Sequence, residues 1–73
     1  MEKLNKILCE VFRLKEHDLK DDLSMSNVQR WDSLTHMDLV TSIEEELNIQ
    51  LSMDDIMNMT DIGTVRAIVG SLI

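Results

Sequence analysis

The hydroxyl of Ser33 is the group in this sequence with the clearest potential for chemistry, because it directly follows Asp32 at the head of an acidic amphipathic segment. A serine nucleophile needs a partner base, and no cysteine, histidine cluster or glycine-rich loop near Ser33 could activate it. A chain this small also offers no acid–base pair, so the sequence predicts that the protein is not an enzyme. Ser33 is then either a structural residue or a site on which another protein performs chemistry.

A helix is expected to begin at Asp32 or Ser33, since either side chain can accept hydrogen bonds from the free N–H groups of a first turn. On local evidence Ser33 is most simply such a cap. The same position also suits a phosphoester, which the unpaired N–H groups and the positive end of the helix dipole would stabilise by roughly 0.3–1 kcal/mol. Both interpretations of Ser33 stay open at this point.

The other candidate ligands predict no metal site. Cys9, His17 and His36 alone provide neither metal-ligand spacing nor a cysteine–histidine–asparagine catalytic set. The stretch DDIMNMTDIGTV contains Asp54 and Asp61, but it lacks the alternating oxygen ligands and the closing glutamate of a calcium-binding loop.

The charge of the chain is divided unevenly along its length. Residues 1–30 contain six acids and six bases, whereas residues 31–65 contain eight acids and no base, which with Arg66 gives a net charge of −7. A surface of one sign repels nucleic acid and attracts basic proteins. We therefore expect protein partners and no binding to nucleic acid.

Length and composition predict a single domain over residues 1–73. The chain has two glycines, no proline and 44% hydrophobic residues, which is typical of a compact helical domain. No apolar run approaches the length needed to cross a bilayer, and the segment MEKLNKILCEVF does not have the continuous apolar run of a signal peptide, so we expect no membrane insertion. The single cysteine excludes an internal disulfide and suggests a reducing, cytoplasmic setting. A monomer is expected.

The hydrophobic periodicity predicts an all-α fold that starts with a helix over residues 3–15. The apolar face of this helix consists of Leu4, Ile7, Leu8, Val11 and Phe12. A long connection follows over residues 16–31. We expect it to be packed down by its apolar residues, which are Leu19, Leu23, Met25 and Val28.

Three more helices complete the predicted fold. The second runs from Asp32 or Ser33 to about residue 47. A short third helix over residues 53–58 is preceded by a variant capping box formed by Ser52 and Asp55. The last helix spans about 64–72, so the sequence predicts a four-helix bundle with a short third helix and a long first loop.

The second helix has two distinct sides on a helical wheel of about 100° per residue. The core stripe consists of Leu39, Val40, Ile43 and Leu47. The opposite side gathers Asp38, Thr41, Ser42 and Glu45, with Leu34 among them and Met37 at the edge beside Glu44. Apolar residues embedded in an acidic face are typical of a docking surface, while an ordinary solvated face is the simpler interpretation.

Taken together, these residues resemble the acyl carrier proteins and their peptidyl and aryl carrier relatives. The resemblance rests on Asp32-Ser33-Leu34 at a helix start, LVTSIEEELNI over residues 39–49, Asp54-Asp55, and Thr64-Val65 near the last helix. It covers the whole sequence and implies a four-helix bundle. It also implies that a phosphopantetheinyl transferase attaches 4′-phosphopantetheine from coenzyme A to Ser33.

The resemblance implies that the protein carries an acyl or aminoacyl group as a thioester on this cofactor. The group would pass between acyl-loading, condensing or transferring enzymes that have basic docking patches. The residues that match the family's partner-binding positions are Asp32, Leu34, Met37, Asp38, Glu44 and Glu45. A pocket for the acyl chain is expected among Val40, Ile43, Ile56, Met59, Ile62 and Ile68.

Three residues depart from the pattern of carriers in housekeeping fatty-acid synthesis. Trp31 replaces a small residue, Thr35 replaces an acid and Thr41 replaces an apolar recognition residue. The departures favour a specialised pathway of the polyketide, lipid or peptide type over fatty acid biosynthesis. The alternative from another class is an acidic helical interaction module without a cofactor, in which Ser33 is only a cap.

Several remaining side chains allow two interpretations. Four methionines are expected either to fill gaps in the core or to form an adaptable lining for the carried chain: Met37, Met53, Met57 and Met59. His36 is expected on the core side as a neutral, hydrogen-bonded histidine, with a pH-sensitive contact to the phosphate as the alternative. Cys9 is expected to be a small core residue of the first helix.

Overall fold

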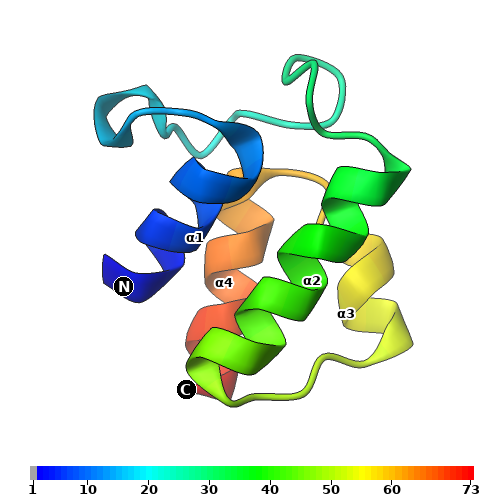
Figure 1. Cartoon of the computed structure of the whole chain (residues 1–73). Coiled ribbons are helices and arrows are strands. Elements are labelled where there is room, and N and C mark those ends of the chain that lie inside the picture. The colour runs from blue at the N-terminus through cyan, green and yellow to red at the C-terminus, as the bar shows by residue number, and fades with distance from the viewer. Residues whose placement is uncertain (1) are drawn as a thin grey trace.

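The computed structural model describes residues 2–73 and consists of four α-helices with a single 3-10 turn (Figure 1). The long helices pack alongside one another, α3 lies beside α2, and the long loop between α1 and α2 crosses one end of the bundle. The predicted all-α, four-helix fold with a short third helix is confirmed. The elements are α1 (Glu2–Phe12), η1 (Glu16–Asp18), α2 (Ser33–Leu47), α3 (Met53–Asn58) and α4 (Ile62–Leu72).

The first helix ends three residues earlier than its hydrophobic pattern predicts. Arg13 adopts the left-handed conformation, with φ of 55°, and the N–H of Leu14 donates to the carbonyl of Cys9 at 3.0 Å. This hydrogen bond spans five residues, as in the Schellman motif that closes many helices. The chain therefore turns at Arg13, and Leu14 packs against the core from outside the helix.

Side-chain caps determine where the other three helices begin. Asp32 caps α2 by accepting a hydrogen bond from the N–H of Thr35 at 2.9 Å. Ser52 and Asp55 form the predicted capping box of α3. Asp61 caps α4 by accepting from the N–H of Thr64 at 2.6 Å, so that α4 starts two residues before its expected position.

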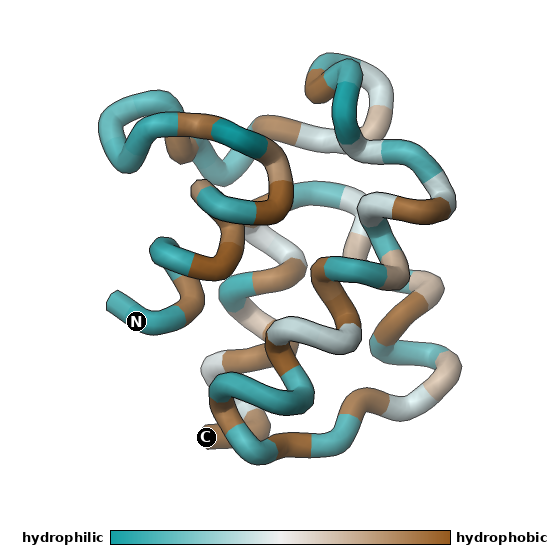
Figure 2. The backbone as a smooth tube through the Cα atoms, in the orientation of Figure 1, coloured by the Kyte–Doolittle hydropathy of each residue, from teal (hydrophilic) through white to brown (hydrophobic). Residues whose placement is uncertain are grey.

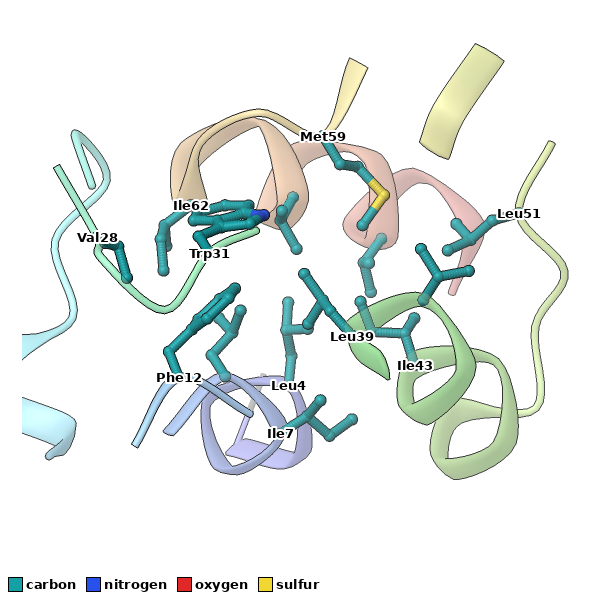
Figure 3. Packing of buried hydrophobic residues seen from close by; sticks show 14 residues of the cluster. Leu4, Ile7, Phe12, Val28, Trp31, Leu39, Ile43, Leu51, Met59 and Ile62 are labelled. Atoms are coloured by element: carbon teal, nitrogen blue, oxygen red, sulfur yellow. The ribbon is translucent and has the colours of Figure 1, made fainter. Parts of the chain in front are cut away.

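The core consists of apolar side chains from α1, α2, α4 and the loops between them (Figure 3). Figure 2 marks the hydrophobic and hydrophilic positions along the same backbone. Trp31, at the end of the long loop, is 2% exposed, and its ring lies 4.5 Å from that of Phe12. The buried side chains are Leu4, Ile7, Leu8, Phe12, Val28, Trp31, Leu39, Val40, Ile43, Leu51, Met59, Ile62, Val65 and Val69.

The long loop is packed down, as predicted, and backbone hydrogen bonds join it to the start of α4. The N–H groups of Ile62 and Gly63 donate to the carbonyls of Leu23 and Asp21. A side chain on Gly63 would come within 3.3 Å of Asp21, so glycine permits this close approach. One predicted anchor was wrong: Met25 is 42% exposed, because its backbone pairs with the carbonyl of Thr60 while its side chain faces outward.

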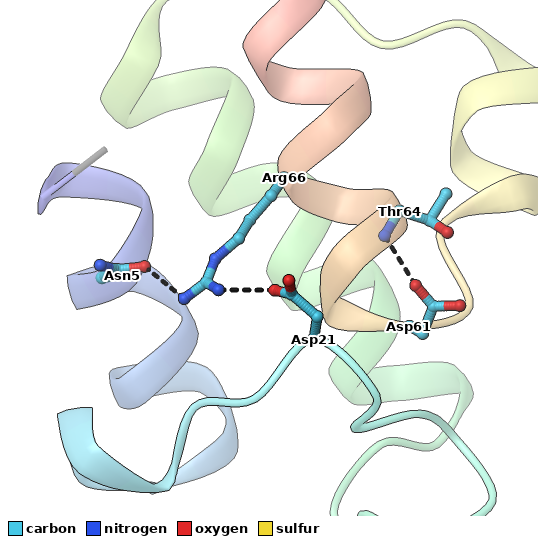
Figure 4. A network of polar contacts seen from close by, with 5 residues as sticks. All are labelled: Asn5, Asp21, Asp61, Thr64 and Arg66. Carbon is cyan, nitrogen blue, oxygen red and sulfur yellow. Dashed lines mark hydrogen bonds and ion pairs between the residues drawn. The ribbon is translucent and has the colours of Figure 1, made fainter.

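Arg66 connects three parts of the chain from its position on α4 (Figure 4). Its guanidinium donates to the carboxylate of Asp21 in the long loop at 2.7 Å and to the side-chain oxygen of Asn5 in α1 at 3.0 Å. The chain segments before and after α2 are thereby tied together. None of the helices within residues 2–73 is long and apolar enough to cross a membrane.

Replacing Arg13 with glycine should stabilise the fold. Glycine adopts the left-handed conformation without the steric cost paid by residues with a Cβ atom, a gain of about 1 kcal/mol in the free energy of unfolding. Urea unfolding measures the gain. Arg13→Ala is the matched control, because it removes the guanidinium and keeps the Cβ atom; equal stability of the two variants would contradict the explanation.

Stability should fall in acid partly through the caps of α2 and α4. The pKa values of Asp32 and Asp61 lie below the usual aspartate value because the N–H groups of Thr35 and Thr64 donate to their carboxylates. The unfolded chain therefore takes up these protons first, so the stabilisation is complete above about pH 4 and is lost as the pH falls through the lowered values.

The difference between unfolding midpoints in urea at pH 7 and pH 3 measures this effect. It should shrink in Asp32→Asn and Asp61→Asn, because the amide oxygen can still cap a helix and does not titrate. Asp38→Asn alters an exposed acid of α2 that caps no helix and serves as the control. If all three variants shrink the difference equally, the caps are not its source.

Candidate functional site

Ser33 is the first residue of α2 and its side chain is exposed. The cap of the helix is Asp32, and within residues 2–73 the Ser33 hydroxyl makes no hydrogen bond. The structure therefore separates the two roles that the sequence left open, because the capping role belongs to Asp32. The Ser33 hydroxyl remains accessible to another molecule.

The surroundings of Ser33 fit a phosphoester. The N–H groups of the first turn of a helix lack carbonyl partners within that helix and give this end a partial positive charge. An exposed hydroxyl at this position can be modified without displacing a side chain from the core. Ser33 is thus a suitable attachment point for the phosphate of a covalently bound cofactor.

Trp31 and His36 flank the serine and bind each other. The indole N–H of Trp31 donates to Nδ1 of His36 at 3.0 Å, and Nε2 of His36 lies 2.8 Å from the carbonyl oxygen of Ile56 in α3. Since an indole N–H only donates and a carbonyl only accepts, His36 is neutral and carries its hydrogen on Nε2. Both ring nitrogens are engaged, which agrees with the predicted hydrogen-bonded histidine and not with a contact to the phosphate.

Five of the six expected partner-binding residues are exposed, four of them at the start of α2 and Glu45 in its last turn. Leu34 is 80% exposed and Met37 is 52% exposed. The three exposed acids are Asp32, Asp38 and Glu45. The exposed side of α2 therefore presents apolar and negatively charged groups together, without a base.

Glu44 has a different environment from the other five. It is half-buried, and its Oε2 accepts a hydrogen bond from the N–H of Leu51 at 2.9 Å. This hydrogen bond holds the connection between α2 and α3, so one carboxylate oxygen of Glu44 already has a partner within the domain.

The methionines do not share one environment. Met59 is completely buried, as expected of a gap-filling residue, while Met53 and Met57 of α3 are 71% and 69% exposed. Met37 of α2 is also exposed, and neither interpretation of the methionines anticipated these three exposed side chains. Met53 and Met57 are four residues apart and therefore lie on the same side of α3.

The six residues expected to form an acyl pocket belong to one contiguous region of the core. Ile43, Met59 and Ile62 are completely buried, and Figure 3 shows Met59 and Ile43 on one side of the core cluster and Ile62, the first residue of α4, beside Trp31. Val40 is also buried, and Ile56 and Ile68 pack partly buried against the same cluster. The α3 residue Ile56 thus lies at the side of the group where α3 meets the bundle.

The structure supplies no metal-binding cluster, since no group of three histidine, cysteine or acidic side chains within residues 2–73 is arranged to hold an ion. Cys9 is half-buried. Burial, followed by the nearby charges of Glu16, Asp18 and Glu10, raises the pKa of the Cys9 thiol. The thiol is therefore largely protonated at neutral pH.

Comparisons with known proteins agree with this geometry. The family described as "Phosphopantetheine attachment site" matches residues 2–72. The chain is similar to the holo acyl carrier protein of Geobacter metallireducens, with 25% identity and a TM-score of 0.83 over 99% of this chain and 86% of that one.

A second solved structure supports the fold alone. It is a Mycobacterium tuberculosis protein whose assignment as an acyl carrier protein is provisional, with 24% identity and a TM-score of 0.82 over 96% of this chain and 93% of that one. A comparison with curated protein sequences gives no match.

The cofactor-free interaction module is not supported by these comparisons, because the matched family carries covalently attached 4′-phosphopantetheine. Acyl carrier proteins have no catalytic activity of their own and interact with phosphopantetheinyl transferases and acyl-handling enzymes. The match over nearly the whole length, together with the helical bundle, shows that the chain belongs to the acyl carrier protein family.

Proposed function

We propose that Ser33 is the residue that bears the phosphopantetheine of this carrier. The observation that carries the proposal is the exposed Ser33 hydroxyl at the first position of α2, which has no hydrogen-bond partner within residues 2–73 because Asp32 caps the helix. When bound, the cofactor supplies the thiol that holds an acyl or aminoacyl group as a thioester. The residues of the chain hold the attachment point at the end of a rigid helix.

The exposed side of α2 is the proposed docking surface for the transferase and for the enzymes that load, condense or transfer the carried group. Leu34 and Met37 provide apolar contact area next to the attachment point. Asp38 and Glu45 provide negative charge on the same side of the helix. Apolar anchors surrounded by acids fit partners that have an apolar depression bordered by lysine or arginine.

The proposed acyl pocket is the region of the core among Val40, Ile43, Ile56, Met59, Ile62 and Ile68. It consists entirely of apolar side chains, as a hydrocarbon chain requires. Methionine at position 59 adds a flexible side chain that can adjust its shape to a guest.

The biological setting of the proposed carrier is a specialised cytoplasmic pathway of the polyketide, lipid or peptide type. Trp31, Thr35 and Thr41 support this proposal because they differ from the residues typical of fatty-acid synthesis carriers. The uneven charge also supports it, since the neutral first half of the chain contrasts with an acidic second half. A monomer presents the docking surface without obstruction.

Incubation with a broad-specificity phosphopantetheinyl transferase, magnesium and coenzyme A should add one phosphopantetheine to the protein. Intact-protein mass spectrometry measures the gain, and Ser33→Ala should show none because it lacks the accepting hydroxyl. Ser26→Ala removes another exposed serine and should be modified like the wild type. If Ser33→Ala still gained the group, or if the wild type did not while a control carrier did, Ser33 would not be the attachment site.

Charge-reversal variants on α2 should show which of its acids belong to the docking surface. We expect Asp38→Lys and Glu45→Lys to lower kcat/KM for the transferase by about fivefold or more at low salt, because they oppose a basic partner surface. Glu46→Lys is the matched control, since Glu46 is exposed but lies about 120° from Leu34 around the helix. Equal losses in all three variants would indicate a general charge effect and contradict a defined docking surface.

A further inference from the structure

Helix α3 depends on contacts with its surroundings because it cannot be stable alone. It has six residues, and none of them is buried. Isolated helices shorter than about 12 residues are marginal in water. The buried residues nearest to it, Leu51 and Met59, flank the helix and lie outside its bounds.

A hydrogen bond from His36 of α2 reaches the helix itself. The Nε2–H of His36 donates to the carbonyl of Ile56 at 2.8 Å across twenty positions of sequence. Carbonyls in the last turn of a helix lack N–H partners within it, so His36 satisfies a group that α3 cannot satisfy by itself. Within residues 2–73 this is the one side-chain hydrogen bond that joins α3 to another helix.

Trp31 holds His36 in the orientation that this contact requires. Its indole N–H donates to Nδ1 of His36 at 3.0 Å, which leaves the histidine hydrogen on Nε2, facing Ile56. Trp31 is itself immobilised, because it is 2% exposed and packs on Phe12. A continuous chain of contacts therefore runs from the core, past the start of α2, to the last turn of α3.

We propose that His36 is a positioning residue that latches α3 onto α2, with Trp31 as its support. Val40, Ile43 and Met59 belong to the buried core cluster, and Ile56 of α3 packs against this cluster. Moving α3 away from α2 breaks the hydrogen bond from His36. The latch therefore opposes opening of the core on this side, a consequence that rests on the proposed acyl pocket.

Amide hydrogen exchange on the unmodified full chain tests the latch. In His36→Phe, which keeps a planar ring and loses both hydrogen bonds, the amide of Ile56 and its neighbours in α3 should exchange about fivefold faster or more. The reference amides are those of Leu8 in α1 and Val69 in α4, which report general unfolding. The measured quantity is the acceleration in α3 relative to these references.

Conservative variants distinguish positioning from simple loss of packing. His36→Gln can still donate to the Ile56 carbonyl and should restore α3 exchange to within about twofold of the wild type. Trp31→Phe removes the indole donor and should accelerate amide exchange in α3 by about twofold or more. His17→Phe alters the exposed histidine of η1 and should leave α3 unchanged.

The proposal is overturned if His36→Phe accelerates amide exchange equally in α1, α3 and α4, or if amide exchange in α3 stays at the wild-type rate. Either result would show that α3 is held by contacts other than His36. The experiment needs no cofactor, so its result is independent of attachment at Ser33, which mass spectrometry tests. Amide shifts of Val40, Ile43 and Met59 after loading with an octanoyl group test the pocket separately.

Discussion

The position of Ser33 at the start of α2 depends on the burial of Trp31 against Phe12. The indole is 2% exposed and packs on Phe12, and it anchors the end of a long loop that is also held by the buried Val28, by backbone hydrogen bonds to α4 and by the ion pair between Asp21 and Arg66. Because Trp31 is fixed, the chain must leave the core at the next residue, where Asp32 starts α2. The following residue, Ser33, is then exposed. An attachment point on an irregular loop would have no such fixed relation to the bundle.

In this arrangement three consecutive residues have three different structural roles. Trp31 packs, Asp32 caps and Ser33 is left with an accessible hydroxyl. A short acidic and apolar surface then continues along α2 through Leu34 and Met37. A carrier has to be modified and visited by several enzymes, and a rigid helix lets each of them meet the same surface in the same geometry.

Much of this organisation could be predicted from the sequence, since α2 combines a capping signal, a regular core stripe and a distinct acidic side. The end of α1 could not, because the apolar Leu14 continues the helical pattern while the backbone has already turned at Arg13. The exposure of Met53 and Met57 was missed because the burial of a six-residue helix depends on the bundle it meets. The hydrogen bond between His36 and Ile56 joins residues far apart in the sequence, which no local pattern encodes.

The environment of Cys9 has a consequence for a protein that carries thioesters. Thioesters exchange with thiolates, so a reactive cysteine in the carrier could remove the acyl group from the cofactor by transthioesterification. Partial burial and nearby acids keep the pKa of the Cys9 thiol raised, which leaves little of the nucleophilic thiolate at neutral pH. The domain can thus contain a sulfur atom close to its core without competing with its own cofactor for the cargo.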